Sequence, residues 1–188
     1  ICLPTHNTSI AIAGASAVAA CVAYGIEGGA DTGELWRVAD RAARLGSERG
    51  YRTPTVDLCA RLDAVYAAVH GVDGQEALRL LRDVFGTGVD TAETIPAVLV
   101  CVQLAGGDPT VATRMTAMLG GDTDTIGAIA GAICGAMHPE RFPAEDVGLL
   151  SSVNGIDFDD LAEGLAEART EAASVLPVPS PRNVVVAH

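Results

Sequence analysis

The most constraining part of this sequence runs from Gly120 to Ala136, where a glycine pair and two aspartates lead into a run of small and apolar residues. Glycines recur in that run every four residues, at Gly127, Gly131 and Gly135. In an α-helix this spacing places the glycines on one face, so a neighbouring backbone can approach closely. The pattern therefore predicts a central helix that packs tightly against its neighbours.

Oxygen-bearing side chains stand just before this run, at Asp122, Asp124 and Thr125. Mg²⁺ and Mn²⁺ prefer oxygen ligands, and Mg²⁺ usually takes one or two carboxylates from a protein. The preceding Gly120 and Gly121 allow a sharp turn close to a ligand, and a helix N-terminus favours anions. Asp and Thr are also ordinary helix N-cap residues. Spacing alone therefore leaves two alternatives, a metal site and a simple helix cap.

The string from Gly120 to Thr125, followed by a helix of small residues, resembles the C-terminal metal motif of the ADP-ribosylglycohydrolase family. That family includes dinitrogenase reductase activating glycohydrolase and the ADP-ribosyl-acceptor hydrolases. Two further segments are similar to recurring pieces of the family, the Leu-Pro-Thr-His-Asn segment from Leu3 to Asn7 and the segment from Glu93 to Ala97. The resemblance extends in consistent order over about residues 4–170 and implies a compact multi-helix, all-α bundle.

The resemblance also implies roles for eight residues. Three match the residues that bind the paired Mg²⁺ or Mn²⁺ ions of the family: Asp122, Asp124 and Thr125. Five match residues that contact the bound ADP-ribose: Thr5, His6, Gly120, Gly121 and Thr123. The implied reaction is hydrolysis of the glycosidic bond that joins ADP-ribose to a modified protein or to a small acceptor.

Two family motifs are missing from this sequence. Family members carry an upstream Gly-Asp-Ala-Xaa-Gly stretch with an acidic residue after it, and a Thr-Asp-Asp motif that completes the metal site. Neither is present here. The resemblance therefore implies a C-terminal portion, with the catalytic acidic residue in an N-terminal segment of the same protein. Three functions remain open: an ADP-ribosyl hydrolase, a hydrolase of another ribosyl or N-glycosidic compound, and a non-catalytic crystallin-like binding or structural protein.

Composition favours helices throughout. Hydrophobic residues make up 49% of the chain and aromatic residues only 4%, so the core must consist mainly of Ala, Val, Leu and Ile. Alanine has the highest helix propensity, and no stretch alternates convincingly over strand lengths. We expect one all-α domain over residues 1–176 and an extended, proline-containing tail over residues 177–188.

The chain is strongly acidic, with a formal charge of −12 and no lysine. Such a surface repels phosphate backbones and anionic lipids, so we expect neither nucleic acid nor membrane as a partner. The uncharged run from Ser9 to Ile26 approaches the length of a membrane span, but its small residues and lack of a basic flank favour a buried, central helix. Five cysteines without a Cys-x-x-Cys pair indicate buried thiols in a reducing, cytoplasmic compartment.

Apolar periodicity and cap residues predict the helices and three details within them. The predicted ranges are 8–24, 32–49, 55–70, 75–85, 91–105, 109–118, 126–137, 149–154 and 157–175. Asp108 and Pro109 suit an N-cap and a first helical position. Pro96 is expected in the first turn of its helix. Glu93, close to the start of the same helix, is expected to cap it or to reach a ligand, with capping favoured. In the last helix, the spacing predicts burial of Phe158, Leu161, Leu165 and Ala168.

Overall fold

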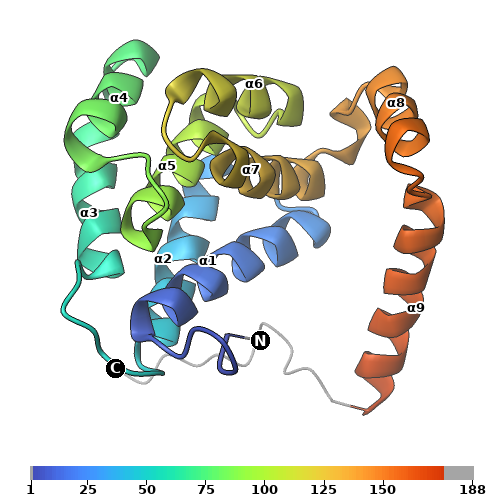
Figure 1. The fold of residues 1–188 in the computed structure, drawn as a ribbon, viewed down its shortest axis with the longest axis horizontal. Coiled ribbons are helices and arrows are strands. Elements are labelled where there is room, and N and C mark those ends of the chain that lie inside the picture. The colour runs from blue at the N-terminus through green and yellow to red at the C-terminus, as the bar shows by residue number, and fades with distance from the viewer. Residues whose placement is uncertain (1, 176–188) are drawn as a thin grey trace. The chain divides into compact units, whose positions relative to one another are not determined.

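The structure, a computed structural model, describes residues 2–175 and confirms the all-α prediction (Figure 1). Within that range the chain forms nine α-helices and no β-strand. They are α1 (Ser9–Ile26), α2 (Thr32–Ser47), α3 (Leu58–Val69), α4 (Gly74–Leu80), α5 (Thr91–Leu104), α6 (Pro109–Leu119), α7 (Thr123–Met137), α8 (Ala144–Asn154) and α9 (Phe158–Val175). A π-helical turn, η1 (Leu81–Phe85), extends α4, and a 3₁₀ turn, η2 (Pro139–Arg141), follows α7. The predicted tail over residues 177–188 lies outside the described residues.

Aspartate caps define the starts of five consecutive helices. In each helix from α2 to α6, the carboxylate of an aspartate accepts a hydrogen bond from a backbone N–H of the first turn. In chain order these aspartates are Asp31, Asp57, Asp73, Asp90 and Asp108. The predicted pair of Asp108 as N-cap and Pro109 at the first helical position is thereby confirmed. Because these signals are local, the predicted helix starts fall within a few residues of the observed ones.

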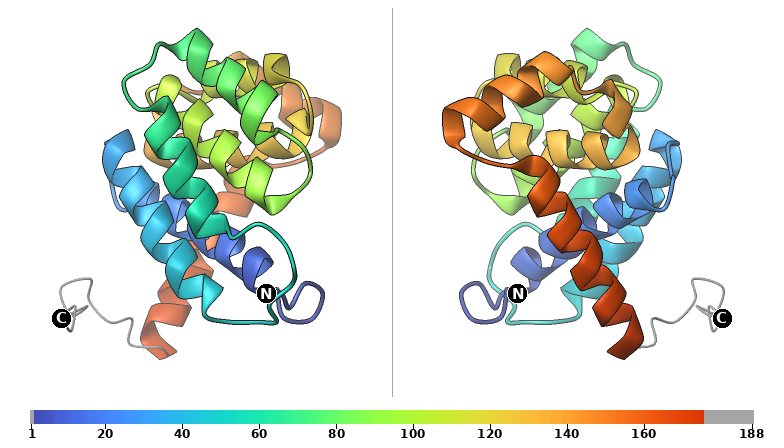
Figure 2. Two further views of the ribbon diagram at one scale, coloured as in Figure 1. Left: turned by 90° about the vertical axis from the view of Figure 1, so that its left-hand side faces the viewer. Right: turned by 90° about the vertical axis from the view of Figure 1, so that its right-hand side faces the viewer.

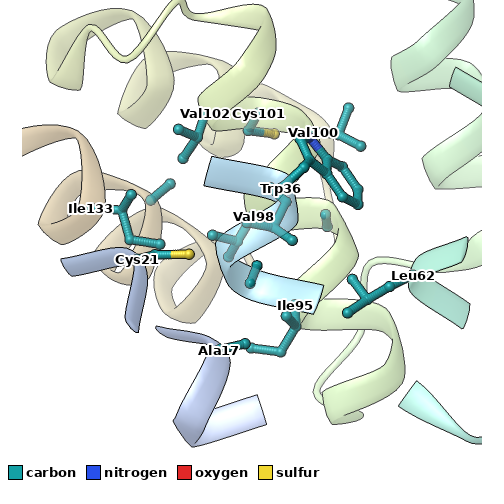
Figure 3. Close-up of a cluster of buried hydrophobic side chains, with 14 of the residues drawn as sticks. Ala17, Cys21, Trp36, Leu62, Ile95, Val98, Val100, Cys101, Val102 and Ile133 are labelled. Atoms are coloured by element: carbon teal, nitrogen blue, oxygen red, sulfur yellow. The ribbon is translucent and has the colours of Figure 1, made fainter. Parts of the chain in front are cut away.

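The core is built around α5, in which ten of the fourteen residues are buried. Figure 3 shows labelled side chains of α1, α2, α3 and α7 surrounding those of α5. One prediction for this helix is wrong. Pro96 is the sixth residue of α5 and therefore lies in its second turn, where proline removes one backbone hydrogen bond. Pro96 is itself fully buried, so packing against its neighbours keeps the chain helical at this position.

Helix α1 is covered on most of its surface, because only Ala15, Ala19, Ala23 and Ile26 within it are exposed. Its buried face carries Ala13, Ala17 and Cys21, and α1 contacts α2, α5 and α7. A Cβ atom on Gly25 would lie 2.7 Å from the backbone of Ala136, so the last turns of α1 and α7 nearly touch. Contacts with α2, α3, α5 and α7 agree with the expected central position of α1. By length and composition alone, α1 is also long and apolar enough to cross a membrane.

The glycine face of α7 explains how closely this helix packs. A Cβ atom on Gly127 would lie 3.0 Å from the hydroxyl of Thr116, and one on Gly131 would lie 3.1 Å from the methyl group of Thr113, both on α6. A Cβ atom on Gly135 would lie 2.6 Å from the ring of Phe142. The predicted tight packing of this helix is confirmed, but the atoms nearest to its glycine face are side-chain atoms of α6 and of Phe142 rather than a second backbone.

The chain divides into two compact units, residues up to Phe142 and residues from Pro143 onward. The second unit contains α8 and α9, joined by a short connection (Figure 2). No residue from 143 to 172 is buried, and Phe158, Leu161 and Leu165 are 40%, 55% and 72% exposed. The predicted burial of these side chains and of Ala168 is therefore wrong within this chain. The single domain over residues 1–176 stays a prediction.

Buried thiols provide a chemical check on the core. Burial raises the pKa of Cys21, Cys101 and Cys134 to about 12, with a smaller contribution to Cys101 from its neighbour Cys134. At pH 8 only about one in 10⁴ of these thiols would be ionised, and the thiolate is the reactive form. We expect iodoacetamide to modify the half-buried Cys2 in the folded protein and to spare these three until denaturant is added. Rapid native labelling of Cys101, measured by peptide mass spectrometry, would contradict this packing.

Candidate metal centre

The candidate site lies at the junction between α6 and α7. Helix α6 ends at Leu119, and the chain turns through Gly120 and Gly121, whose φ angles are 85° and 80°. Such left-handed values suit glycine. Helix α7 begins at Thr123, three residues earlier than predicted. Asp124 and Thr125 therefore lie in the first turn of a helix rather than in a loop.

A second loop, between η1 and α5, supports this junction. The backbone N–H of Asp122 donates a hydrogen bond to the carbonyl oxygen of Thr87 at 2.7 Å. A Cβ atom on Gly121 would collide with the same carbonyl oxygen, so glycine is required for this close approach. Thr87 is buried. The two loops therefore form one packed structure, although they are far apart in the sequence.

Glu93 holds the second loop in place. Its carboxylate accepts the N–H of Gly88 at 2.8 Å, and the Thr94 hydroxyl donates to the Gly88 carbonyl at 2.9 Å. The predicted capping role of Glu93 is wrong, because Asp90 caps α5 by accepting the N–H of Ala92 at 2.9 Å. Sequence reasoning missed the supporting role of residues 86–88. The two glycines there, at positions 86 and 88, were the available signal.

Removing the Glu93 carboxylate should loosen the site. We expect Glu93→Ala to lower the free energy of unfolding by about 1–3 kcal/mol, because the Gly88 N–H loses its acceptor in a half-buried position. Glu93→Gln keeps an acceptor oxygen and should lose less. Urea unfolding of both variants measures the difference. Equal stability of Glu93→Ala and the unsubstituted protein would show that the Gly88 contact contributes nothing.

Asp122 occupies an N-cap position without acting as a cap. Its backbone has φ −83° and ψ 63°, outside the extended geometry of the five aspartate caps, and its carboxylate accepts no hydrogen bond from the first turn of α7. Among the described aspartates at helix starts, Asp31 and Asp108 show the usual pattern, in which a backbone N–H is bound. The simple helix-cap alternative therefore does not account for the Asp122 carboxylate.

The carboxyl groups of Asp122 and Asp124 lie close together. A hydrogen bond with the Asp122 side chain, together with the backbone N–H groups of Asp124 and Thr125, lowers the pKa of Asp124 below its usual value. No arginine or histidine forms an ion pair with either carboxylate in the described part of the chain. Two neighbouring carboxyl groups repel each other when both are ionised, and a cation or a shared proton relieves that repulsion.

The donor set suits a hard cation but is small. Asp122, Asp124 and the Thr125 hydroxyl are the candidate oxygen ligands at this junction, in line with the one or two carboxylates that Mg²⁺ usually takes from a protein. Among residues 2–175, no group of three or more His, Cys, Asp and Glu side chains is placed to hold a metal ion. The described residues can therefore start the coordination of one ion, whereas a pair of ions needs further ligands.

Thr5 and His6 lie in the turn that precedes α1. The backbone N–H of His6 donates to the carbonyl oxygen of Cys2 at 2.7 Å in a turn before α1, and both side chains are exposed. The next residue, Asn7, accepts the N–H of Tyr51 at 2.9 Å. Within the described residues, no hydrogen bond or ion pair joins Thr5 or His6 to the Asp122 junction. The junction itself comprises Gly120 to Thr125, including the half-buried Thr123, whereas Thr5 and His6 precede α1, a helix that contacts α7.

Comparison with known proteins assigns the family. A sequence model described as ADP-ribosylglycohydrolase matches residues 1–174. The chain belongs to the ADP-ribosylglycohydrolase family. This family member is similar to the uncharacterized protein YegU of Escherichia coli strain K12, with 38% identity over 180 residues that cover 92% of this chain and 52% of YegU. The chain therefore spans about half the length of this curated relative. No solved structure shows a significant match to this chain.

Proposed function

We propose that this chain carries metal ligands of a metal-dependent hydrolase that removes ADP-ribose from a modified protein or a small acceptor. The observation that carries the proposal is the pair formed by Asp122 and Asp124, two adjacent carboxyl groups that neither pair with arginine nor, for Asp122, cap the helix. Membership of the ADP-ribosylglycohydrolase family supports a glycohydrolase activity. The uncompensated carboxylates favour this function over the non-catalytic, crystallin-like alternative.

Mg²⁺ or Mn²⁺ is the proposed cofactor, with Asp122, Asp124 and Thr125 as the ligands from this chain. When bound, such ions hold ribose hydroxyls, orient water and offset developing charge. The chain has a charge of −12 and the diphosphate of ADP-ribose is also negative, so a cation at this junction would make the local field favourable for the substrate. Two ions are expected, as in the family that the sequence resembles.

The chain's own residues have three roles in this proposal. Asp122 and Asp124 hold the cations, and the Thr87 carbonyl fixes the backbone at Asp122. Gly120 and Gly121 lack side chains, which leaves the backbone open to the ribose and the diphosphate. Thr5, His6 and Thr123 are proposed to contact the ADP-ribose.

Further groups are required beyond these residues. Hydrolysis through an oxocarbenium-like transition state needs a carboxylate as acid, base or electrostatic partner. We place this carboxylate and the remaining metal ligands in an N-terminal segment of the same protein, because the described residues offer no third carboxylate at the junction.

The test is release of ADP-ribose from an ADP-ribosylated protein and from a small ADP-ribosylated acceptor by the full-length protein. We expect release with Mg²⁺ or Mn²⁺ and none after treatment with EDTA. Release that continues undiminished in EDTA would rule out metal dependence. Absence of release from both substrates, with metal still bound, would contradict the ADP-ribosyl assignment and favour another ribosyl compound as substrate.

A further inference from the structure

A cavity that shares no residue with the Asp122 junction lies where α1, α2 and α3 meet. Its volume is about 170 Å³, which is enough for an anion of the size of phosphate. The lining comes from the start of α1, the end of α2, and the connection that leads into α3. Because all of these residues belong to the first unit, that unit forms the cavity by itself. We refer to it as the α1–α3 cavity.

Hydroxyl groups make up much of the polar lining. They belong to Ser9, Ser47, Thr53 and Thr55. The Ser47 hydroxyl donates a hydrogen bond to the carbonyl oxygen of Arg44 at 2.7 Å. Within residues 2–175, the hydroxyls of the other three residues have no hydrogen-bond partner. A hydroxyl rotates to suit its partner, so these three groups can donate to an oxyanion in the cavity.

Arg52 provides a positive charge in the same lining. The guanidinium groups of Arg37, Arg44 and Arg79 each pair with a carboxylate at 2.7–2.9 Å. Arg52 forms no ion pair in the part of the chain that the structure describes, although the chain has 24 acidic and 12 basic residues. A guanidinium offers five N–H donors in a geometry that matches phosphate and carboxylate oxygens. Its donors therefore remain available to a ligand.

The other charges around the cavity do not oppose an anion strongly. Asp57 also contributes to the lining, but its carboxylate accepts the N–H of Ala60 at 2.9 Å as the N-cap of α3. The positive end of the α3 dipole thus offsets this negative charge. Helix α1 carries no charged side chain, and its first residues, Ser9 and Ile10, border the cavity with the positive end of that helix.

Backbone contacts hold the connection in place beside α1. The N–H of Ser9 donates to the carbonyl oxygen of Tyr51 at 2.9 Å, and the N–H of Tyr51 donates to that of Asn7 at 2.9 Å. Arg52 follows Tyr51 directly, and Pro54 restricts the backbone between the two threonines. The donors are therefore largely ordered before any ligand arrives, which lowers the entropic cost of binding.

We propose that the α1–α3 cavity binds a phosphate group, either as free inorganic phosphate or as the phosphate of a nucleotide. Arg52 supplies the charge, and the hydroxyls of Ser9, Thr53 and Thr55 supply further hydrogen bonds. The inference rests on the cavity and its donors. It does not depend on the metal centre or on hydrolysis.

The test is a phosphorus nuclear magnetic resonance titration of inorganic phosphate with the chain of residues 1–188, in EDTA to exclude metal. We expect saturable one-to-one binding that Arg52→Gln weakens at least about tenfold, because a hydrogen-bonded charge is lost. Arg49→Gln is the matched control. Arg49 also lacks an ion pair within residues 2–175 and does not line the cavity, so this variant should bind phosphate within about twofold of the unsubstituted chain.

A second variant keeps the test independent of charge. Thr53→Val preserves the shape of the side chain but removes its hydroxyl, and it should weaken phosphate binding to a smaller degree. Circular dichroism checks that each variant stays folded. Three results would overturn the proposal: no saturable phosphate binding, undiminished binding by Arg52→Gln, or equal weakening by Arg52→Gln and Arg49→Gln, which would indicate attraction by charge alone.

Adenosine monophosphate distinguishes the two sources of the phosphate group. If it displaces inorganic phosphate and binds more tightly, in a manner that Arg52→Gln weakens, the cavity takes a nucleotide phosphate. If it leaves the bound phosphate in place, the cavity takes free phosphate. Both results support the α1–α3 cavity as a phosphate site.

Discussion

Asp122→Asn and Asp124→Asn should each lower metal-dependent release of ADP-ribose by at least about 100-fold, because a bound cation supplies several kcal/mol of charge stabilisation. Asparagine keeps the size and one oxygen of the side chain but removes the charge that holds the cation. In the part of the chain that the structure describes, neither carboxylate forms an ion pair with arginine. We therefore expect the free energy of unfolding of Asp122→Asn to change by no more than about 0.5 kcal/mol.

Asp108→Ala serves as the control, because it should lower stability and leave the release of ADP-ribose unchanged. Its carboxylate accepts the N–H of Val111 at 3.0 Å at the start of α6, so its loss should cost about 1 kcal/mol of stability. Release of ADP-ribose should stay near the unsubstituted rate. Steady-state kinetics and urea unfolding of the three variants separate the two roles. If Asp122→Asn retains full metal-dependent activity, the junction is not the metal centre.

Gly121→Ala should disrupt the same junction through the backbone. The added Cβ collides with the Thr87 carbonyl oxygen, and alanine is strained at a φ of 80°. We expect a loss of about 2–4 kcal/mol in the free energy of unfolding, which combines left-handed strain with displacement of the loop at residues 86–88. The hydrogen bond from Asp122 to Thr87 should break, and metal affinity should fall with it.

Gly120→Ala is a matched control for this substitution. Gly120 has nearly the same φ angle, 85°, but nothing lies within 4 Å of the position that its Cβ would take. The substitution should therefore cost only the backbone strain, about 1–2 kcal/mol. Denaturant titrations of both variants isolate the contribution of the Thr87 contact. Equal losses for Gly120→Ala and Gly121→Ala would show that the contact between the two loops is unimportant.

Local signals in the sequence predicted the helices well. The aspartate caps act within one turn, and the glycine spacing of α7 depends on helix geometry alone, so both could be recognised without tertiary information. Helix α7 begins three residues before its predicted range, because the polar residues that precede the apolar run at Ile126 already adopt helical geometry. Helix α8 begins at Ala144, five residues before its predicted range. The motif around Asp122 and the family resemblance followed directly from the residue string.

Long-range features could not be predicted in this way. The Thr87 carbonyl meets Asp122 across a large sequence separation, and no pattern in either loop specifies that pairing. The position of Pro96 in the second turn of α5 depends on packing around that helix. The exposure of Leu161 and Leu165 shows the same limit, because their spacing predicts burial without naming the partner that would cover them.

Manganese binding tests the central claim most directly. Mn²⁺ can be titrated into the chain of residues 1–188, with free ion followed by electron paramagnetic resonance, and the titration needs neither substrate nor catalytic acid. We predict saturable binding that the double variant Asp122→Asn/Asp124→Asn abolishes and that Asp108→Ala leaves unchanged. Unchanged Mn²⁺ binding by the double variant would contradict the assignment of the junction between α6 and α7 as the metal centre.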